Sequence, residues 1–280
     1  MKIKSLLMAA TAGLLLSVAS ANAGAFIISG TDSDDHGSNN GTANVGGWLY
    51  MQKALENIAG GVTNGNKTVV TLGTSASTAG TAASSAFAFS SLAPTWSIGT
   101  VDGTTNITNF FNGTGAFNTG NTGIIMIDSG EINVSGGIDA SEEAILTANA
   151  AALNAFVGAG GGLFAQASVL GWLSALIPGV TVTDVGSGGD GSALLLTAAG
   201  SAAFPGLTNG DLSTGPWHHH FANYSPLSLL AKSDDNFDVI IGGVGGSITN
   251  PRVPEPITVT LFGAGLAGVA ALRRRKAKKA

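Results

Sequence analysis

The sequence predicts an α/β fold in which a largely parallel sheet is flanked by helices. Short apolar runs alternate along the chain with longer segments of helical periodicity, which is the order of elements that builds such sheets. The run GIIMID at 123–128 is apolar almost throughout, as in a strand that helices cover on both faces. No internal repeat is evident, so one domain accounts for the body of the chain, residues 24–250.

The candidate strands share short length and a high content of Ile, Leu, Val and Thr. They are AFIIS (25–29), TVVTL (68–72), GIIMID (123–128), LFAQAS (163–168), VTVTDV (180–185), LSLLAKS (227–233) and FDVIIGG (237–243).

Two segments have the periodicity of amphipathic helices. The first spans 48–59 and the second 141–157, with apolar residues recurring on one face of each. Asp139 and Glu142 have the spacing of a capping box at the start of the second helix, and a glycine run ends it. The Ser-, Thr-, Ala- and Gly-rich stretch at 73–91 is low in complexity, so no element is predicted there.

The N-terminal segment has the pattern of a secretory signal peptide. Lys2 and Lys4 precede the apolar run LLMAATAGLLLSV, and the small residues Ala21 and Ala23 form a signal-peptidase site. We therefore expect residues 1–23 to direct the chain to the Sec translocon and to be removed by signal peptidase. The run is shorter than the roughly 20 residues of a membrane helix, which disfavours an uncleaved anchor.

The C-terminal segment, residues 251–280, combines a short motif, an apolar run and a basic end. The motif is Val253-Pro254-Glu255-Pro256, and 257–272 carries no charge. Seven of the twelve basic residues lie from Arg252 onward, including Arg273, Arg274 and Arg275. This order predicts a marginal transmembrane span whose basic tail stays in the cytoplasm.

This C-terminal order resembles the PEP-CTERM sorting signal of Gram-negative bacteria. The resemblance implies recognition by an exosortase-type membrane protease that cuts near Pro254-Glu255-Pro256. It also implies a transient stay in the inner membrane, followed by the cell surface, the outer membrane or the extracellular space. An ordinary C-terminal anchor is the alternative.

Charge and cysteine content exclude several classes of function. Between 25 and 252, four basic residues stand against sixteen acidic ones, a net charge of −12. Such a body repels nucleic acid and attracts divalent cations. The chain contains no cysteine, which excludes disulfides, thiolate catalysis and cysteine-based metal sites.

The order of elements in the body loosely resembles exported relatives of the class I glutamine amidotransferase-like fold, a flavodoxin-type layout. In that family a nucleophilic cysteine follows the strand that corresponds to 163–168. Here the segment reads AQASVLGW, with Gln166, Ala167 and Ser168 in place of a cysteine, so glutaminase chemistry is excluded. A serine nucleophile at Ser168 with a histidine base is disfavoured because the segment lacks a Gly-x-Ser-x-Gly elbow.

Two loops carry candidate metal ligands. The loop TDSDDHGS follows the first strand, and ligands of open α/β sheets bind at the carboxyl ends of strands. In the segment GPWHHHFAN, alternate histidines of a strand share one face. The candidate ligands for calcium, zinc or manganese are Asp32, Asp34, Asp35, His36, His218 and His220. The alternative is that the acids only cap or solvate the loop and that the histidines lie on the surface.

Three functions remain open at this stage. The first is an exported, non-catalytic protein of an exopolysaccharide or biofilm matrix. The second is a metal-dependent hydrolase that uses the two loops, and the third is a calcium-dependent glycan-binding module. The fold class alone does not choose among them.

Overall fold

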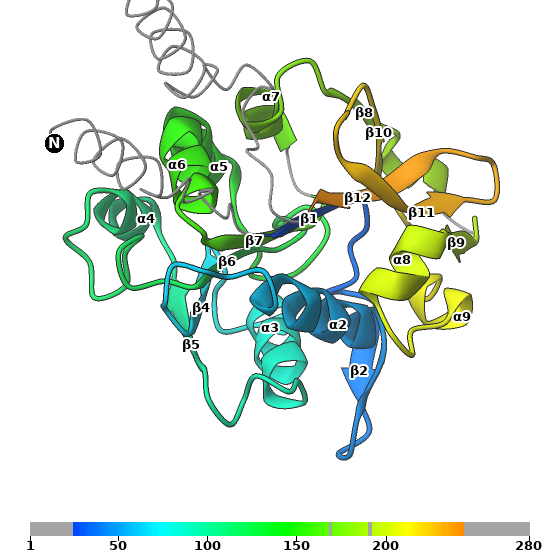
Figure 1. Cartoon of the computed structure of the whole chain (residues 1–280), viewed down its shortest axis with the longest axis horizontal. Coiled ribbons are helices and arrows are strands. Elements are labelled where there is room, and N and C mark those ends of the chain that lie inside the picture. The colour runs from blue at the N-terminus through cyan, green and yellow to red at the C-terminus, as the bar shows by residue number, and fades with distance from the viewer. Residues whose placement is uncertain (1–24, 168–169, 190–191, 244–280) are drawn as a thin grey trace, which may run out of the picture. The chain divides into compact units, whose positions relative to one another are not determined.

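The computed structural model describes residues 25–167, 170–189 and 192–243 (Figure 1). Its centre is an eight-stranded sheet with the order β5-β4-β6-β7-β1-β12-β11-β9. The strands are β1 (Phe26–Ser29), β4 (Thr68–Leu72), β5 (Ser97–Val101), β6 (Ile124–Ile127), β7 (Gly162–Ala165), β9 (Leu194–Leu196), β11 (Ser228–Ser233) and β12 (Asp238–Gly243). The five from β5 to β1 are parallel and the last three antiparallel, so the largely parallel α/β sheet is confirmed.

Helices cover both faces of the parallel part. On one face lie α2 (Gly47–Ala59) and α3 (Thr78–Ala88), and on the other α4 (Thr104–Phe111), α5 (Ala140–Ala148), α6 (Ala150–Gly158) and the short α7 (Leu173–Leu176) (Figure 1). The chain moves one way along the sheet from β1 to β5 and the other way from β5 to β7. Because parallel crossovers are right-handed, this reversal places the two sets of helices on opposite faces.

The burial of the strands follows from this sandwich. Every residue of β1, β6 and β7 is buried, and side chains alternate between two apolar clusters, with Ile27 in one and Phe26 and Ile28 in the other. A strand with helices on both faces has no polar side. The continuous apolar pattern that predicted these strands therefore has its physical reason in the fold.

The chain order of the strands differs from the flavodoxin-type layout. Numbered along the chain, the parallel strands have the spatial order 3-2-4-5-1, whereas that layout has 2-1-3-4-5. β1 takes the position that the last strand has there. The α/β class is thus confirmed, and the flavodoxin-type resemblance is not.

Two of the element predictions need correction. The low-complexity stretch at 73–91 contains α3, whose small residues Ala82, Ala83 and Ala86 are buried against the core. Burial in the tertiary structure stabilises a helix that local propensity does not predict. The helix predicted at 141–157 is two helices, α5 and α6, divided at Asn149, whose side-chain amide donates to the Ile145 carbonyl at 2.9 Å.

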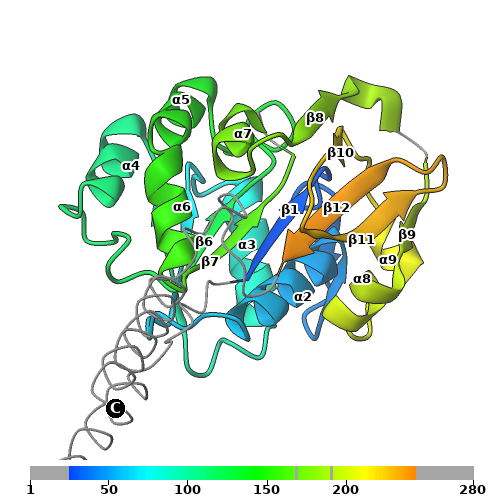
Figure 2. The same cartoon turned by 45° about the horizontal axis from the view of Figure 1, so that its top comes forward.

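Smaller elements lie outside the main sheet and its covering helices (Figure 2). The strand predicted at 180–185 is β8 (Thr181–Asp184), which pairs with β10 (His219–Ala222) in a separate ribbon rather than with the main sheet. Further elements are the hairpin β2 (Gly37–Asn39) and β3 (Asn44–Gly46), the helices α8 (Ala198–Ala203) and α9 (Asn209–Leu212), and the 3₁₀ turns η2 (Leu170–Trp172) and η3 (Gly186–Gly189).

The predicted terminal signals lie outside the described residues. This applies to the signal peptide at 1–23 and to the span at 257–272. Among the helices that the structure does describe, none is long and apolar enough to cross a bilayer.

Candidate functional site

The loops after β1, β4, β6 and β7 meet at the carboxyl edge of the sheet. Ser129, after β6, donates its N–H and its hydroxyl to the two carboxylate oxygens of Asp34, after β1, at 2.8 and 2.6 Å. Thr74, after β4, donates to Asp128 at 2.5 Å. The Asn133 amide donates to the carbonyls of Ser129 and Ala167, both at 2.7 Å. Hydrogen bonds of polar side chains thus link the four loops that follow β1, β4, β6 and β7.

Two of these side chains, Asp34 and Asp128, are buried carboxyl groups that have no basic partner within the part of the chain that the structure describes. The pKa of Asp34 is raised to about 7, mainly by burial and next by the nearby Asp128, against the hydrogen bonds from Ser129, which lower it. Burial also raises the pKa of Asp128, against hydrogen bonds from Thr74 and from the N–H groups of Ile138 and Gly130. Their hydrogen bonds tie the site's loops together, and neither residue faces the pocket described below.

Beside them, Asp32 is in contact with two histidines. The Nε2 atoms of His36 and His218 lie 3.3 and 3.0 Å from the same oxygen, Asp32 Oδ2. Asp32 is only 3% exposed, and its second oxygen, Oδ1, is buried without a hydrogen-bond partner among the described residues. Asp35 Oδ2 lies 3.7 Å from His36 Nε2. Residues 32 and 218, which are far apart in the sequence, therefore form one cluster.

The position of His218 is fixed by its backbone and by its ring. Its N–H donates to the Gly30 carbonyl at 2.8 Å, and its carbonyl accepts from Val185 N at 2.8 Å. The ring Nδ1 lies 2.8 Å from the carbonyl oxygen of Gly186. A carbonyl only accepts hydrogen bonds, so Nδ1 carries the proton. The Nε2 atom of His218 is thereby directed at Asp32.

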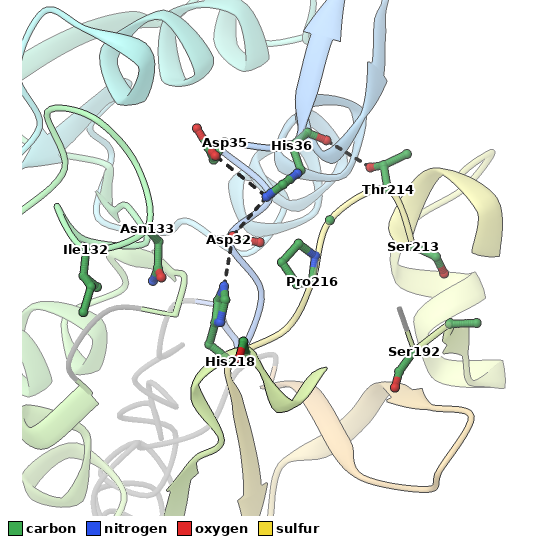
Figure 3. A pocket seen from close by; sticks show the side chains of 13 residues that line it. Asp32, Asp35, His36, Ile132, Asn133, Ser192, Ser213, Thr214, Pro216 and His218 are labelled. Carbon is green, nitrogen blue, oxygen red and sulfur yellow. Dashed lines mark hydrogen bonds and ion pairs between the residues drawn. The ribbon is translucent and has the colours of Figure 1, made fainter. Parts of the chain in front are cut away.

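A pocket of about 770 Å³ opens above this cluster (Figure 3). In Figure 3 the rings of His36 and His218 point toward Asp32 from two sides. The walls come from the loop after β6, from the segment around η3 and from the turn after α9. The lining residues are Asp32, Asp35, His36, Ile132, Asn133, Ser187, Ser192, Ala193, Ser213, Thr214, Gly215, Pro216 and His218.

The structure separates the remaining predicted ligands from this cluster. Asp34 is fully buried and turned to Ser129. The His220 ring packs against Phe237 at a tilt, with centroids 4.7 Å apart, and contacts Trp217 edge-on. Within the described parts of the chain, no three His, Asp or Glu side chains are placed to hold a metal ion as they stand. In the Asp32 cluster the imidazole nitrogens contact the carboxylate directly.

Sequence reasoning missed several polar residues of this edge. Ser129 and Asn133 join the loops, and neither lies in a recognisable motif, although each follows a strongly predicted strand. Gln166, unlike these two, is among the residues expected in place of a cysteine after β7; it is fully buried, and neither amide atom has a partner within the described residues. Ser168, the candidate nucleophile, lies outside the described residues.

Comparison with known proteins identifies the C-terminal signal. The family model for the PEP-CTERM protein-sorting motif matches residues 252–276. This confirms the sorting motif and covers Pro254, Glu255, Pro256 and the three arginines at 273–275. The motif indicates an exported protein that an exosortase, a membrane protease, processes before it reaches the surface. No curated protein and no solved structure matches the chain.

Proposed function

We propose that this chain is a non-catalytic protein of the cell surface or extracellular matrix that binds neutral glycans of an exopolysaccharide or biofilm in the Asp32 pocket. After export through the Sec translocon and removal of residues 1–23, the C-terminal span holds it in the inner membrane until an exosortase acts. Its destination is then the cell surface, the outer membrane or the extracellular space. The chemistry of the pocket carries the proposal about the ligand.

The lining of the pocket is suited to hydroxyl groups. It offers hydroxyls from Ser187, Ser192, Ser213 and Thr214, the amide of Asn133, and carboxylates and imidazoles. These groups both donate and accept hydrogen bonds, as sugar hydroxyls do. Ile132, which is 89% exposed, adds an apolar surface at the rim. A volume of about 770 Å³ lies within the usual range for small-molecule sites.

The charge of the pocket favours neutral over anionic glycans. Asp32 and Asp35 are part of the lining, and no Lys or Arg among the described residues belongs to it. The body itself is strongly acidic. Uronic acids and sulfated sugars are therefore repelled, whereas neutral sugars bind without an electrostatic penalty.

The contacts of His218 support binding rather than turnover. A general base needs a ring nitrogen within reach of the substrate. Here Nδ1 is bonded to the Gly186 carbonyl and Nε2 to Asp32. The metal-dependent hydrolase remains the second candidate, because the two imidazoles converge on one carboxylate oxygen. It needs a cation that activates water, and it predicts release of reducing ends.

Glycan binding is tested with full-length chain in detergent, titrated with neutral oligosaccharides and with uronic-acid oligosaccharides for comparison. Ile132→Ala and Asp35→Ala remove two exposed lining groups, and Val45→Ala and Asp102→Ala are matched exposed controls outside the pocket. The expected result is binding of neutral sugars that only the first pair weakens, without new reducing ends. Equal binding by all four variants, or preference for uronic acids, contradicts the proposal.

A further inference from the structure

We propose that Asp32, His36 and His218 form a binding site for one divalent transition-metal cation of the zinc type, at the base of the pocket. The inference goes beyond the proposed function, because cation binding does not require that a glycan binds. It assigns to one centre three of the six candidate ligands and leaves Asp34 and His220 outside it.

The first argument is the convergence of ligand atoms. Asp32 Oδ2 lies 3.3 Å from Nε2 of His36 and 3.0 Å from Nε2 of His218. Bonds of 2.0–2.1 Å at tetrahedral angles place neighbouring zinc ligands about 3.3 Å apart. Both nitrogen–oxygen distances are thus close to those between ligands of one metal. Asp32 and His36 share one loop, and only the fold brings His218 to them.

The second argument is the tautomer of His218. Because Nδ1 donates its proton to the Gly186 carbonyl, Nε2 of the neutral ring has only a lone pair. That lone pair faces a carboxylate oxygen at 3.0 Å, so a positive charge must lie between the two atoms: either a proton or a cation. A ring whose far nitrogen donates to a backbone carbonyl is the usual arrangement of metal-binding histidine.

The third argument is the carboxylate itself. Asp32 is 3% exposed, and among the described residues its ion pairs are to histidine alone. Its Oδ1 atom is buried and unpartnered. A buried carboxylate oxygen without a donor is costly, and a cation bound to the carboxylate reduces that cost.

At present His218 is hydrogen-bonded to Asp32 and the His36 ring lies against the same oxygen, so a cation must enter between the carboxylate and the two imidazoles. His36 is the ligand able to move, because its side chain is 36% exposed while its carbonyl is held by Gly47 N and by the Thr214 hydroxyl. Asp35, whose side chain is 40% exposed, lies 3.7 Å from the His36 ring and supplies a further oxygen on the pocket side.

The ligand set selects the class of metal. Two imidazole nitrogens with one carboxylate suit zinc and its neighbours. Calcium requires six to eight oxygen ligands, which this cluster does not offer. Calcium is therefore a negative control within the same experiment.

The test is calorimetric titration of the full-length chain, in detergent and without a histidine tag, with zinc chloride and separately with calcium chloride. We expect one zinc site, no calcium site, and a melting temperature that rises by about 5–10 °C when free zinc is a hundred times Kd. His36→Ala and Asp32→Asn lower the zinc affinity at least about tenfold, the smallest loss typical of altered metal sites. His220→Ala removes an imidazole outside the cluster, so it should leave the zinc affinity unchanged.

Two results overturn the inference. One is the absence of stoichiometric zinc binding. The other is zinc binding that His36→Ala leaves intact, and this variant is informative because the His36 side chain is 36% exposed. Glycan binding that persists in a chelator, without any zinc site, refutes the metal centre while leaving the proposed function standing.

Discussion

Asp34 and Ser129 join the loop after β1 to the loop after β6 through two hydrogen bonds to one buried carboxylate, at 2.8 and 2.6 Å. The same Asp34 presents its backbone carbonyl to the Trp48 indole N–H at 2.9 Å. The loop that carries Asp32 and His36 is therefore anchored on both sides. Asp34, Ser129 and Trp48 do not line the pocket, but their hydrogen bonds hold in place the loop that does.

The buried carboxyl of Asp34 predicts a pH dependence of stability. Its pKa is raised from 3.8 to about 7, so the folded state holds a proton that the unfolded state has already released between these values. The stabilisation is complete below pH 3.8 and is lost as the pH rises to 7, by about 1.4 kcal/mol per unit of pKa difference. Asp34→Asn should flatten this slope in denaturant unfolding series between pH 4 and 7.5. Asp234→Asn, on an exposed turn, is the control, and an unchanged slope in Asp34→Asn contradicts the assignment.

Gly30 allows the segment that holds His218 to approach β1. A Cβ at this position lies 1.8 Å from the His219 carbonyl oxygen, so that backbone must shift. Gly30→Ala should lower the free energy of unfolding by about 1–3 kcal/mol and weaken ligand binding in the pocket. Gly158→Ala is the matched control, because a Cβ there meets nothing within 4 Å. Thermal unfolding measures the stability of both variants. Equal stability of the two contradicts the close packing of the His219 backbone against Gly30.

The capping box of α5 predicts a local stability effect. Asp139 accepts from the N–H groups of Ser141 and Glu142 at 2.7 and 2.9 Å, and the Glu142 carboxylate accepts from Asp139 N at 2.9 Å. Asp139→Ala should cost about 1 kcal/mol, whereas Asp139→Ser should retain most of the stability. Chemical denaturation measures both. If serine is as destabilising as alanine, the cap is not the cause.

The sorting motif predicts a processing defect. Glu255→Ala changes the Pro-Glu-Pro sequence within the matched range, so exosortase cleavage near it should fail and the C-terminal segment should remain on the chain. The protein is produced in a host that has an exosortase, and its intact mass shows whether the C-terminal segment has been removed. Glu131→Ala in the body is the control. A Glu255→Ala protein with the same processed mass as the unmodified chain shows that this glutamate is not required.

Local patterns predicted the elements whose signals depend on neighbours in sequence. The apolar runs of β1, β4 and β6 predicted buried strands, and Asp139 with Glu142 predicted the capping box that is observed. The helix α2 occupies almost the predicted range. The strands are recognised by apolar residues on both faces, the helix by its periodicity, and the capping box by two residues within one turn.

The elements that were missed depend on partners elsewhere in the chain. The helix α3 lies in a low-complexity stretch without a clear apolar period, and it is stabilised because Ala82, Ala83 and Ala86 pack against the core. The edge strand β5 is mostly exposed or half-buried, so it has no clear apolar pattern. The break at Asn149 is the exception, because it is local: the side-chain amide and the backbone N–H of Asn149 both donate to the Ile145 carbonyl.

By itself, the sequence determined the α/β class, the principal strands and the C-terminal sorting motif, because apolar period, capping and short linear motifs are local properties of a chain. It also supplied the acidic loop and the histidines as separate candidates. Only the tertiary structure decided which of them meet. The hydrogen bond from His218 N to the Gly30 carbonyl and the bridge between Thr31 and Trp217 bring His218 to Asp32. The packing of His220 against Phe237 and the burial of Asp34 against Ser129 take the other two away. Contacts between residues 32 and 218 depend on the folding of the whole sheet between them, and no local pattern records that.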